Sequence, residues 1–136
     1  MKIFESIRDH FAPLKGHTFS TVAKHPSFKI KRVVSTKWPA SQWTIDITYL
    51  SSGNTDSIYI TDILRVYTCL VSSYWDASGS RWATKDDIQA CINKHCIKKA
   101  QSSCMMALLA TFDDIEPSDN IDPKTRKKCG IRYVPH

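Results

Sequence analysis

Apolar residues recur at about every second position before Thr61 and at every third or fourth position after it. A period of two is typical of a strand with one buried face, and a period of three to four is typical of an amphipathic helix. The change of period therefore predicts a small sheet followed by helices.

Three segments carry the strand pattern. The clearest extends from Trp43 to Tyr49, and its predicted partner extends from Ser57 to Ile60. Residues 51–55 between them include glycine and asparagine, which suit a turn, so an antiparallel hairpin is expected. An earlier strand begins at Phe28, where apolar residues alternate with lysines, and the alternation breaks at residues 32–34, which predicts a β-bulge or a bend.

Four segments carry the helix pattern: Ile3–Leu14, Thr61–Tyr74, Thr84–His95 and Ser103–Asp114. The second and third begin with threonine and have aspartate in the first turn, which favours capped helix starts. The last segment is apolar on nearly every side, so we expect it to be central. The first could complete the core or dock on a second copy, and an amphipathic stripe is usually buried locally. The predicted fold class is α+β: an N-terminal helix, a small antiparallel sheet of three or four strands, and three helices packed on one face of the sheet.

A length of 136 residues suits a single domain, which we assign to residues 1–122, followed by a basic C-terminal tail, residues 123–136. Within the tail, residues 131–134 could add an edge strand or stay mobile. The chain has no apolar run that approaches a membrane span and no pattern of a secretion signal, so a cytoplasmic location without a membrane partner is expected. An odd number of irregularly spaced cysteines, five, predicts reduced thiols.

The net charge of +6 is unevenly distributed along the chain. Residues 1–45 hold eight Lys and Arg against two acids, residues 46–122 hold six against eleven, and residues 123–136 hold five against none. An anionic partner should therefore meet the sheet or the two ends of the chain rather than the central helices. A solvated basic face without a partner would produce the same distribution.

Basic residues around the first strands, with tryptophans nearby, favour contact with nucleic acid or another polyanion. Trp38 and Trp43 could stack on bases, although the alternation puts Trp43 on the apolar face, and the pattern does not decide whether Trp75 and Trp82 are core or surface residues. The residues expected to make the contacts are Lys24, Lys29, Lys31, Arg32, Lys37, Lys124, Lys127 and Lys128.

Other residue groups give weaker evidence for a metal-binding or catalytic site. Zinc could use a set formed by Cys91, His95, Cys96 and Cys104, but the spacing is not that of paired cysteines on a turn, and small core residues are the alternative. We therefore expect no metal site and no cofactor.

Carboxylates and histidines do not form an evident catalytic group either. Asp46 stands on a strand without the companions of a nuclease site, and the acids at residues 113–116 are typical of a solvated helix end. His10, His17 and His25 have no carboxylate placed to orient them, so an enzyme is not the favoured class.

A resemblance follows from the order of these features. Leu14, Gly16, Phe19 and Thr21, then residues 28–33, the 43–60 hairpin and the helices beginning at Thr61, Thr84 and Ala107, look like small, uncharacterised bacterial α+β domains. Some of these are appended to restriction or nuclease proteins, and the length is similar to that of cargo proteins of mobile elements such as integron cassettes. The resemblance covers about residues 14–116, implies a DNA-associated or defence setting, and transfers no catalytic residue.

The leading hypothesis is therefore a non-enzymatic module that binds nucleic acid or another polyanion through the basic sheet face and the tail. Two alternatives stay open. One is a protein-interaction or homodimerisation module that uses exposed tryptophans and the N-terminal helix. The other is a small enzyme or small-ligand binder with a pocket between sheet and helices.

Overall fold

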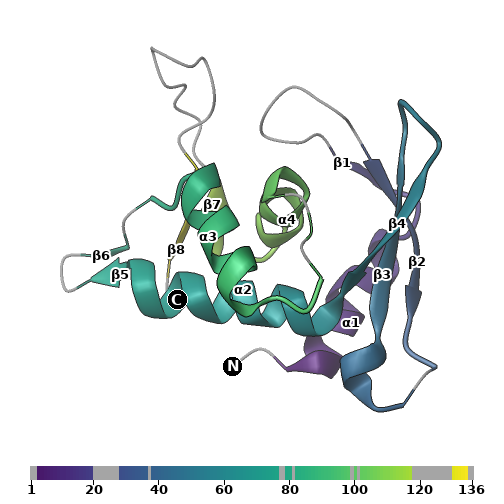
Figure 1. The fold of residues 1–136 in the computed structure, drawn as a ribbon, viewed down its shortest axis with the longest axis horizontal. Helices are drawn as coiled ribbons and strands as arrows, with labels where there is room; N and C mark the ends of the chain where they lie inside the picture. The colour runs from purple at the N-terminus through teal and green to yellow at the C-terminus, as the bar shows by residue number, and fades with distance from the viewer. Residues whose placement is uncertain are drawn as a thin grey trace.

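A computed structural model of the chain places a four-stranded sheet at one end of the molecule and the helices beside it (Figure 1). The structure describes residues 3–19, 28–36, 38–76, 79–80, 82–98, 100, 102–117 and 130–134, and for residues 74–76 and 79–80 it describes the backbone alone.

The main sheet is antiparallel throughout, with the strand order β1-β2-β3-β4. Its strands are β1 (Thr18–Phe19), β2 (Phe28–Val34), β3 (Thr44–Tyr49) and β4 (Thr55–Tyr59). The predicted hairpin is confirmed as β3 and β4, and the turn is tight enough that β4 begins at Thr55 rather than at Ser57. Gly53 adopts a φ of 73° in this turn, a conformation that costs glycine little.

The N-terminal helix completes the core. Helix α1 (Phe4–Phe11) leads into a 3₁₀ turn, η1 (Ala12–Leu14), and a second 3₁₀ turn, η2 (Ala40–Gln42), precedes β3. Ile7 and Phe11 are fully buried, and the Phe11 ring packs edge-on against Phe112 at 5.5 Å between centroids. The expectation that this helix is buried locally is therefore confirmed.

The three later helices are α2 (Ile60–Tyr74), α3 (Lys85–His95) and α4 (Ser102–Leu109). The predicted cap of α3 is confirmed, because the Asp87 backbone N–H donates to Thr84 Oγ1 at 3.2 Å and the Thr84 backbone N–H donates to Asp87 Oδ2 at 2.9 Å. Every residue of α4 is buried, as expected for a central helix, although it ends at Leu109 rather than near Asp114.

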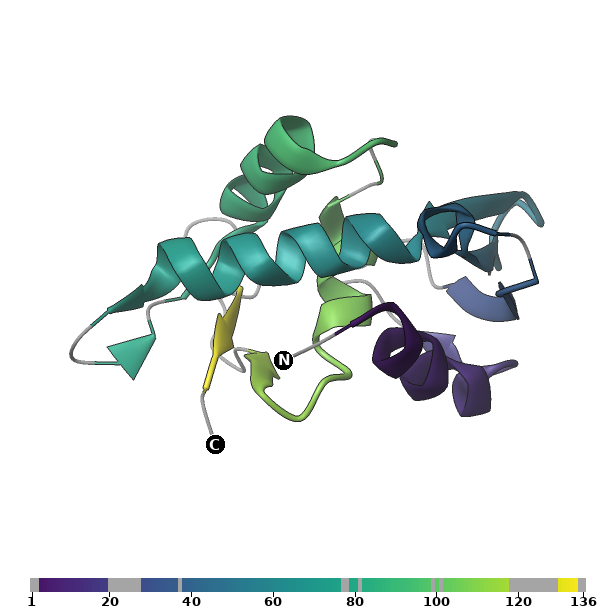
Figure 2. The ribbon, with the colours of Figure 1, turned by 90° about the horizontal axis from the view of Figure 1, so that it is seen from below.

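The helices form layers beside the sheet. In Figure 1, α4 lies between the sheet and α3. In Figure 2, α2 runs along the length of the molecule, with α3 on one side and α1 and β8 on the other. The apolar side chains of β2 and β3 face this helical layer and join its residues in one core. The α+β fold class is therefore confirmed.

Two short hairpins extend the helical part. Strands β5 (Trp75–Asp76) and β6 (Gly79–Ser80) pair directly after α2, and β7 (Ile115–Pro117) pairs with β8 (Ile131–Tyr133). Of the two alternatives for residues 131–134, a strand is what forms, but it pairs with β7 rather than with the main sheet. Ile131 is fully buried and exchanges two backbone hydrogen bonds with Ala83.

The expectation of reduced cysteines is wrong for two of them. Cys69 on α2 and Cys91 on α3 form a disulfide, with 6.3 Å between their Cα atoms. Cys96 and Cys104 are free thiols, and Cys129 lies outside the described residues. The sequence argument failed because it counted cysteines, whereas pairing depends on how closely two helices pack.

None of the helices in the described part of the chain is both long enough and apolar enough to cross a membrane.

Candidate nucleic-acid interface

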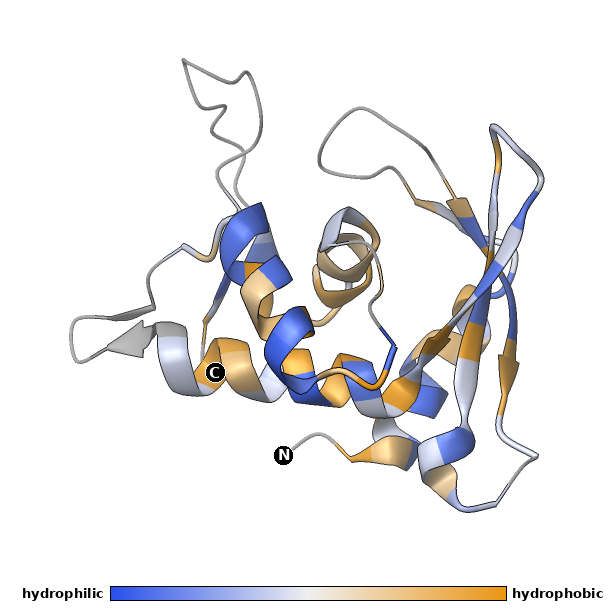
Figure 3. Cartoon of the chain, in the orientation of Figure 1, coloured by the Kyte–Doolittle hydropathy of each residue, from blue (hydrophilic) through white to orange (hydrophobic). Residues whose placement is uncertain are grey.

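The outer face of the sheet, turned away from the helices, presents the basic residues of β2. Phe28 and Ile30 are fully buried. Lys29, which lies between them, and Lys31, which follows Ile30, are exposed. Figure 3 shows the same strand as alternating polar and apolar segments. The alternation predicted from the sequence therefore places two lysines on the solvent side of the sheet.

The predicted irregularity in β2 is confirmed as a register shift. Ile30 pairs with Ile47 and Arg32 pairs with Asp46, so Lys31 is an additional residue in β2. A bulge of this kind lets two consecutive residues face the same side of a sheet. Lys31 and Arg32 are accordingly both exposed, which adds a third cation to the outer face.

Arg32 is held in place by a buried carboxylate. Its Nε donates to Asp46 Oδ2 at 2.7 Å, and Asp46 Oδ1 accepts from Ser57 Oγ at 2.7 Å and from Thr44 Oγ1 at 3.1 Å. The Arg32 side chain is 58% exposed and the Asp46 side chain only 7%. The pair fixes the guanidinium on the outer face while compensating its charge.

The same network sets the protonation of Asp46. Burial acts to raise the pKa of this carboxyl, but the hydrogen bonds from Arg32, Ser57 and Thr44 outweigh burial, so its pKa lies below the ordinary value. Asp46 is therefore an anion at neutral pH with three donors directed at it. This arrangement is typical of a structural ion pair and differs from a catalytic carboxylate, whose pKa is usually raised toward neutrality.

An open depression of about 520 Å³ surrounds this ion pair. Thr44, Ser57 and Tyr59 occupy outward positions of β3 and β4 at its rim. The hydroxyls of Thr44 and Ser57 already donate to Asp46. The Tyr59 hydroxyl can donate to a phosphate oxygen without adding charge. The outer face thus combines exposed lysines with a neutral hydroxyl.

The tryptophans divide between core and surface. Trp38, in the connection from β2 to β3, is 83% exposed, whereas Trp43 is buried as the alternation indicates, with the Arg8 guanidinium 5.1 Å from its ring. Trp82 is half-buried beneath Arg132, at 4.5 Å, and the Trp75 side chain is outside the described part. Among the tryptophans whose side chains the structure describes, Trp38 is therefore the one exposed enough to stack on a base.

Three of the eight expected contact residues come together on the sheet, namely Lys29, Lys31 and Arg32. The other five, Lys24, Lys37, Lys124, Lys127 and Lys128, lie outside the described residues.

The three cysteines considered as zinc ligands each have another partner. Cys91 is in the disulfide, the Cys96 thiol contacts the Asp62 carbonyl at 3.8 Å, and the Cys104 thiol contacts the Tyr49 hydroxyl at 3.6 Å. Burial raises the pKa of the Cys96 thiol to about 12, so this thiol is protonated at neutral pH. Within the described residues, no group of three or more His, Cys, Asp or Glu side chains could hold a metal ion.

The acids after α4 have structural partners. Asp114 accepts a hydrogen bond from the Tyr67 hydroxyl, and Glu116 pairs with Arg132 at 3.1 Å across β7 and β8. His10, which is partly buried, contacts the Thr111 hydroxyl at 2.8 Å and packs on Phe112. The Tyr67–Asp114 contact joins the segment before β7 to α2, the Glu116–Arg132 pair lies within the hairpin, and His10 joins α1 to the turn after α4.

Asp62 in the first turn of α2 has a structural role that the sequence did not indicate. Its side chain is buried and accepts the backbone N–H groups of Ile97 at 2.8 Å and Lys98 at 3.0 Å. The Lys98 ammonium in turn pairs with Asp56 and donates to the Ser57 carbonyl. The start of the connection between α3 and α4 is therefore fastened to the beginning of α2 and to β4.

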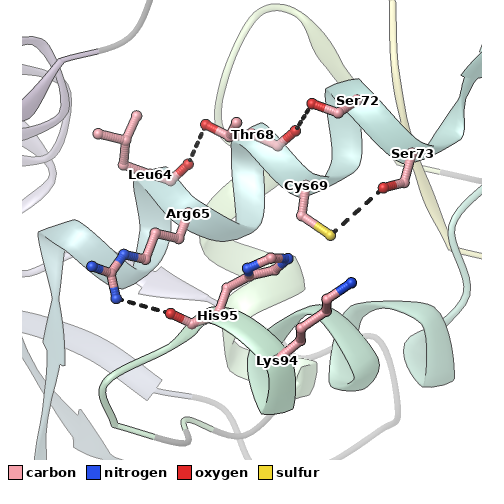
Figure 4. A pocket seen from close by; sticks show the side chains of 8 residues that line it. All are labelled: Leu64, Arg65, Thr68, Cys69, Ser72, Ser73, Lys94 and His95. Carbon is pink, nitrogen blue, oxygen red and sulfur yellow. Dashed lines mark hydrogen bonds between the residues drawn. The ribbon is translucent and has the colours of Figure 1, made fainter.

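A second hollow, of about 700 Å³, lies between α2 and α3 and was not anticipated from the sequence. Figure 4 shows the side chains of Lys94 and His95 extending from α3 toward α2, with Arg65 and Cys69 on the opposite wall. Arg65 Nη1 donates to the His95 carbonyl at 2.9 Å. We refer to this hollow as the α2–α3 groove.

Comparisons with known proteins do not assign a relative. No protein-family model matches the chain, and neither the curated proteins nor the solved structures include a match.

Proposed function

We propose that the chain is a nucleic-acid-binding module that contacts phosphates through the outer face of its main sheet. The observation that carries the proposal is the exposure of Lys29, Lys31 and Arg32 together on one strand of the outer face. Phosphate contacts of lysine and arginine supply most of the affinity of sequence-independent binding.

The exposed Trp38 favours a single strand over a duplex. The Trp38 ring is 83% exposed, so an unpaired base can stack on it. In a duplex the bases are already stacked and are not accessible to the ring. An open sheet face with lysines and an aromatic side chain at one end is typical of single-strand binding surfaces.

Binding across a salt series tests the proposal. The probes are labelled single-stranded and double-stranded DNA and RNA, titrated with the full chain and with a Lys29→Ala/Lys31→Ala variant. Because each phosphate contact contributes about 0.7 to the log–log salt slope for a single strand, losing two contacts should lower the slope by roughly 1.4. Lys85→Ala/Lys94→Ala removes the same charge from α3 and serves as the matched control.

Trp38→Ala separates stacking from charge. It should lower affinity by about 1–3 kcal/mol and leave the salt slope unchanged, because stacking releases no counterions. The proposal fails if the wild-type chain does not bind any of the four probes at low salt, or if the lysine variant and its α3 control lose affinity equally.

A further inference from the structure

The Cys69–Cys91 disulfide borders the α2–α3 groove on one side only. Cys69 lines the groove and is half-buried, whereas Cys91 is 3% exposed. Thiol–disulfide exchange requires an incoming sulfur to reach one of the two disulfide sulfurs from outside. In this structure Cys69 is the accessible end of the bond.

Cations lie one helical turn from each sulfur. Arg65 precedes Cys69 by four residues on α2, and Lys94 follows Cys91 by three residues on α3, spacings that place side chains on the same helix face. His95 is the next residue and points toward α2 (Figure 4). None of the eight residues that line the groove is an aspartate or a glutamate.

These charges match the requirements of exchange. A thiolate is the attacking species and a thiolate is the leaving group, and nearby cations stabilise both. The hydrogen bond from Arg65 to the His95 carbonyl keeps the guanidinium at the groove. Residues 46–122 have an excess of acids, whereas the residues that line the groove include cations and no acids.

We propose that the α2–α3 groove is a site of thiol–disulfide exchange for small thiols that carry carboxylate groups, with Cys69 as the sulfur that is attacked. The incoming thiolate forms a bond to Cys69 Sγ as the Cys69–Cys91 bond breaks, and the electron pair leaves on Cys91 Sγ, which takes a proton from solvent. A second thiolate then attacks the incoming sulfur and releases Cys69. Overall, two small thiols are oxidised to their disulfide and the protein disulfide is reduced to two thiols.

The fold has other contacts that keep α3 in place when the disulfide opens. Ile88 and Ile92 are fully buried against the core, and the Thr84 cap holds the first turn of the helix. Exchange therefore proceeds on the folded chain and is reversible with the corresponding small-molecule disulfide.

Reduction kinetics of the intact chain test the site. The disulfide is reduced with glutathione, which carries two carboxylates, and in parallel with 2-mercaptoethanol, which carries none. Free thiols are trapped by alkylation and mapped by mass spectrometry. Lys94→Gln should slow reduction by glutathione about two- to fivefold more than it slows reduction by 2-mercaptoethanol, because the loss of Lys94 weakens the attraction for any thiolate but also removes the attraction for the glutathione carboxylates. Lys85→Gln, on the first turn of the same helix and outside the groove, should change neither rate.

The site of attack is read separately. In Cys91→Ser, oxidised glutathione should label Cys69 faster than the free Cys96, because Cys69 lies at the groove and Cys96 is a protonated thiol. If this variant does not fold, the mixed disulfide is trapped in the wild-type chain by quenching early in the reduction. Label on Cys91 in the wild type, a glutathione rate insensitive to Lys94→Gln, or a disulfide inert to both thiols would overturn the proposal.

Discussion

Replacing Asp46 by asparagine should destabilise the protein and at the same time strengthen its binding to nucleic acid. The substitution keeps the shape of the side chain and an oxygen that can accept from Thr44 and Ser57, but it removes the charge that pairs with Arg32. The two effects have opposite signs because the same charge stabilises the sheet and neutralises Arg32 on its outer face.

The magnitude of the stability effect follows from the exposure of the two partners. A hydrogen bond between charged groups contributes about 1.5–3 kcal/mol. Since Arg32 is 58% exposed, solvent screening lowers this figure, and we expect a loss of about 1–2 kcal/mol in the free energy of unfolding. For a domain of this size the loss corresponds to a decrease in Tm of roughly 3–10 °C.

The binding effect comes from the released charge. With Arg32 free to contact a phosphate, the log–log salt slope should steepen by about 0.7 for a single strand, and affinity at low salt should rise. Thermal unfolding and a salt series on the same preparation measure both quantities. Asp56→Asn is the matched control, because it frees Lys98, which is bound at the start of the connection between α3 and α4. An Asp46→Asn protein that is folded but binds more weakly, or an equal gain in the control, would refute the reasoning.

Three further outcomes are expected. Gly130→Ala should lower the free energy of unfolding by about 3–5 kcal/mol in chemical denaturation, because a Cβ there would lie 1.8 Å from the Ala83 carbonyl oxygen, whereas Gly53→Ala, with open space around it, should cost about 1 kcal/mol. Asp62→Ala should cost about 2–4 kcal/mol in the same assay, since two backbone N–H groups lose their acceptor. The contribution of Asp46 to stability should be complete above the ordinary aspartate pKa and lost as the pH falls through its lowered native pKa, so Asp46→Asn should flatten this part of an acid titration.

The fold could be predicted because its signals are local. Alternation along β3 and β4, the turn between them and the capped start of α3 each depend on residues within a few positions of one another. The break in the pattern of β2 was also local, and it proved to be a bulge. Such features follow from backbone geometry and side-chain burial alone.

The role of Asp46 could not be predicted, because it depends on strand register. Taken singly, a carboxylate on a strand is a candidate for chemistry, and the sequence places it 14 residues from Arg32. Only the pairing of Arg32 with Asp46 across the bulge shows that the two charges compensate each other. A shift of one residue would have put Asp46 on the apolar face.

The disulfide was missed for a similar reason. Its two cysteines are 22 residues apart on different helices, and their proximity depends on how α2 packs against α3. One signal was present in the sequence: Arg65 and Lys94 each lie one helical turn from a cysteine. That spacing indicates a shared helix face, but it cannot show that the two faces meet.

The two proposed sites are separable because they share few interactions. The network around Arg32 consists of residues from β2, β3 and β4, whereas the disulfide joins α2 to α3, which packs on α2 and α4. Closing a loop of this length contributes about 3 kcal/mol by restricting the unfolded chain, so reduction lowers the stability of the whole domain without removing any contact of the outer face. A change in nucleic-acid affinity on reduction would therefore have to act through global unfolding. Below the unfolding temperature, reducing the Cys69–Cys91 disulfide should leave nucleic-acid binding by the sheet unchanged.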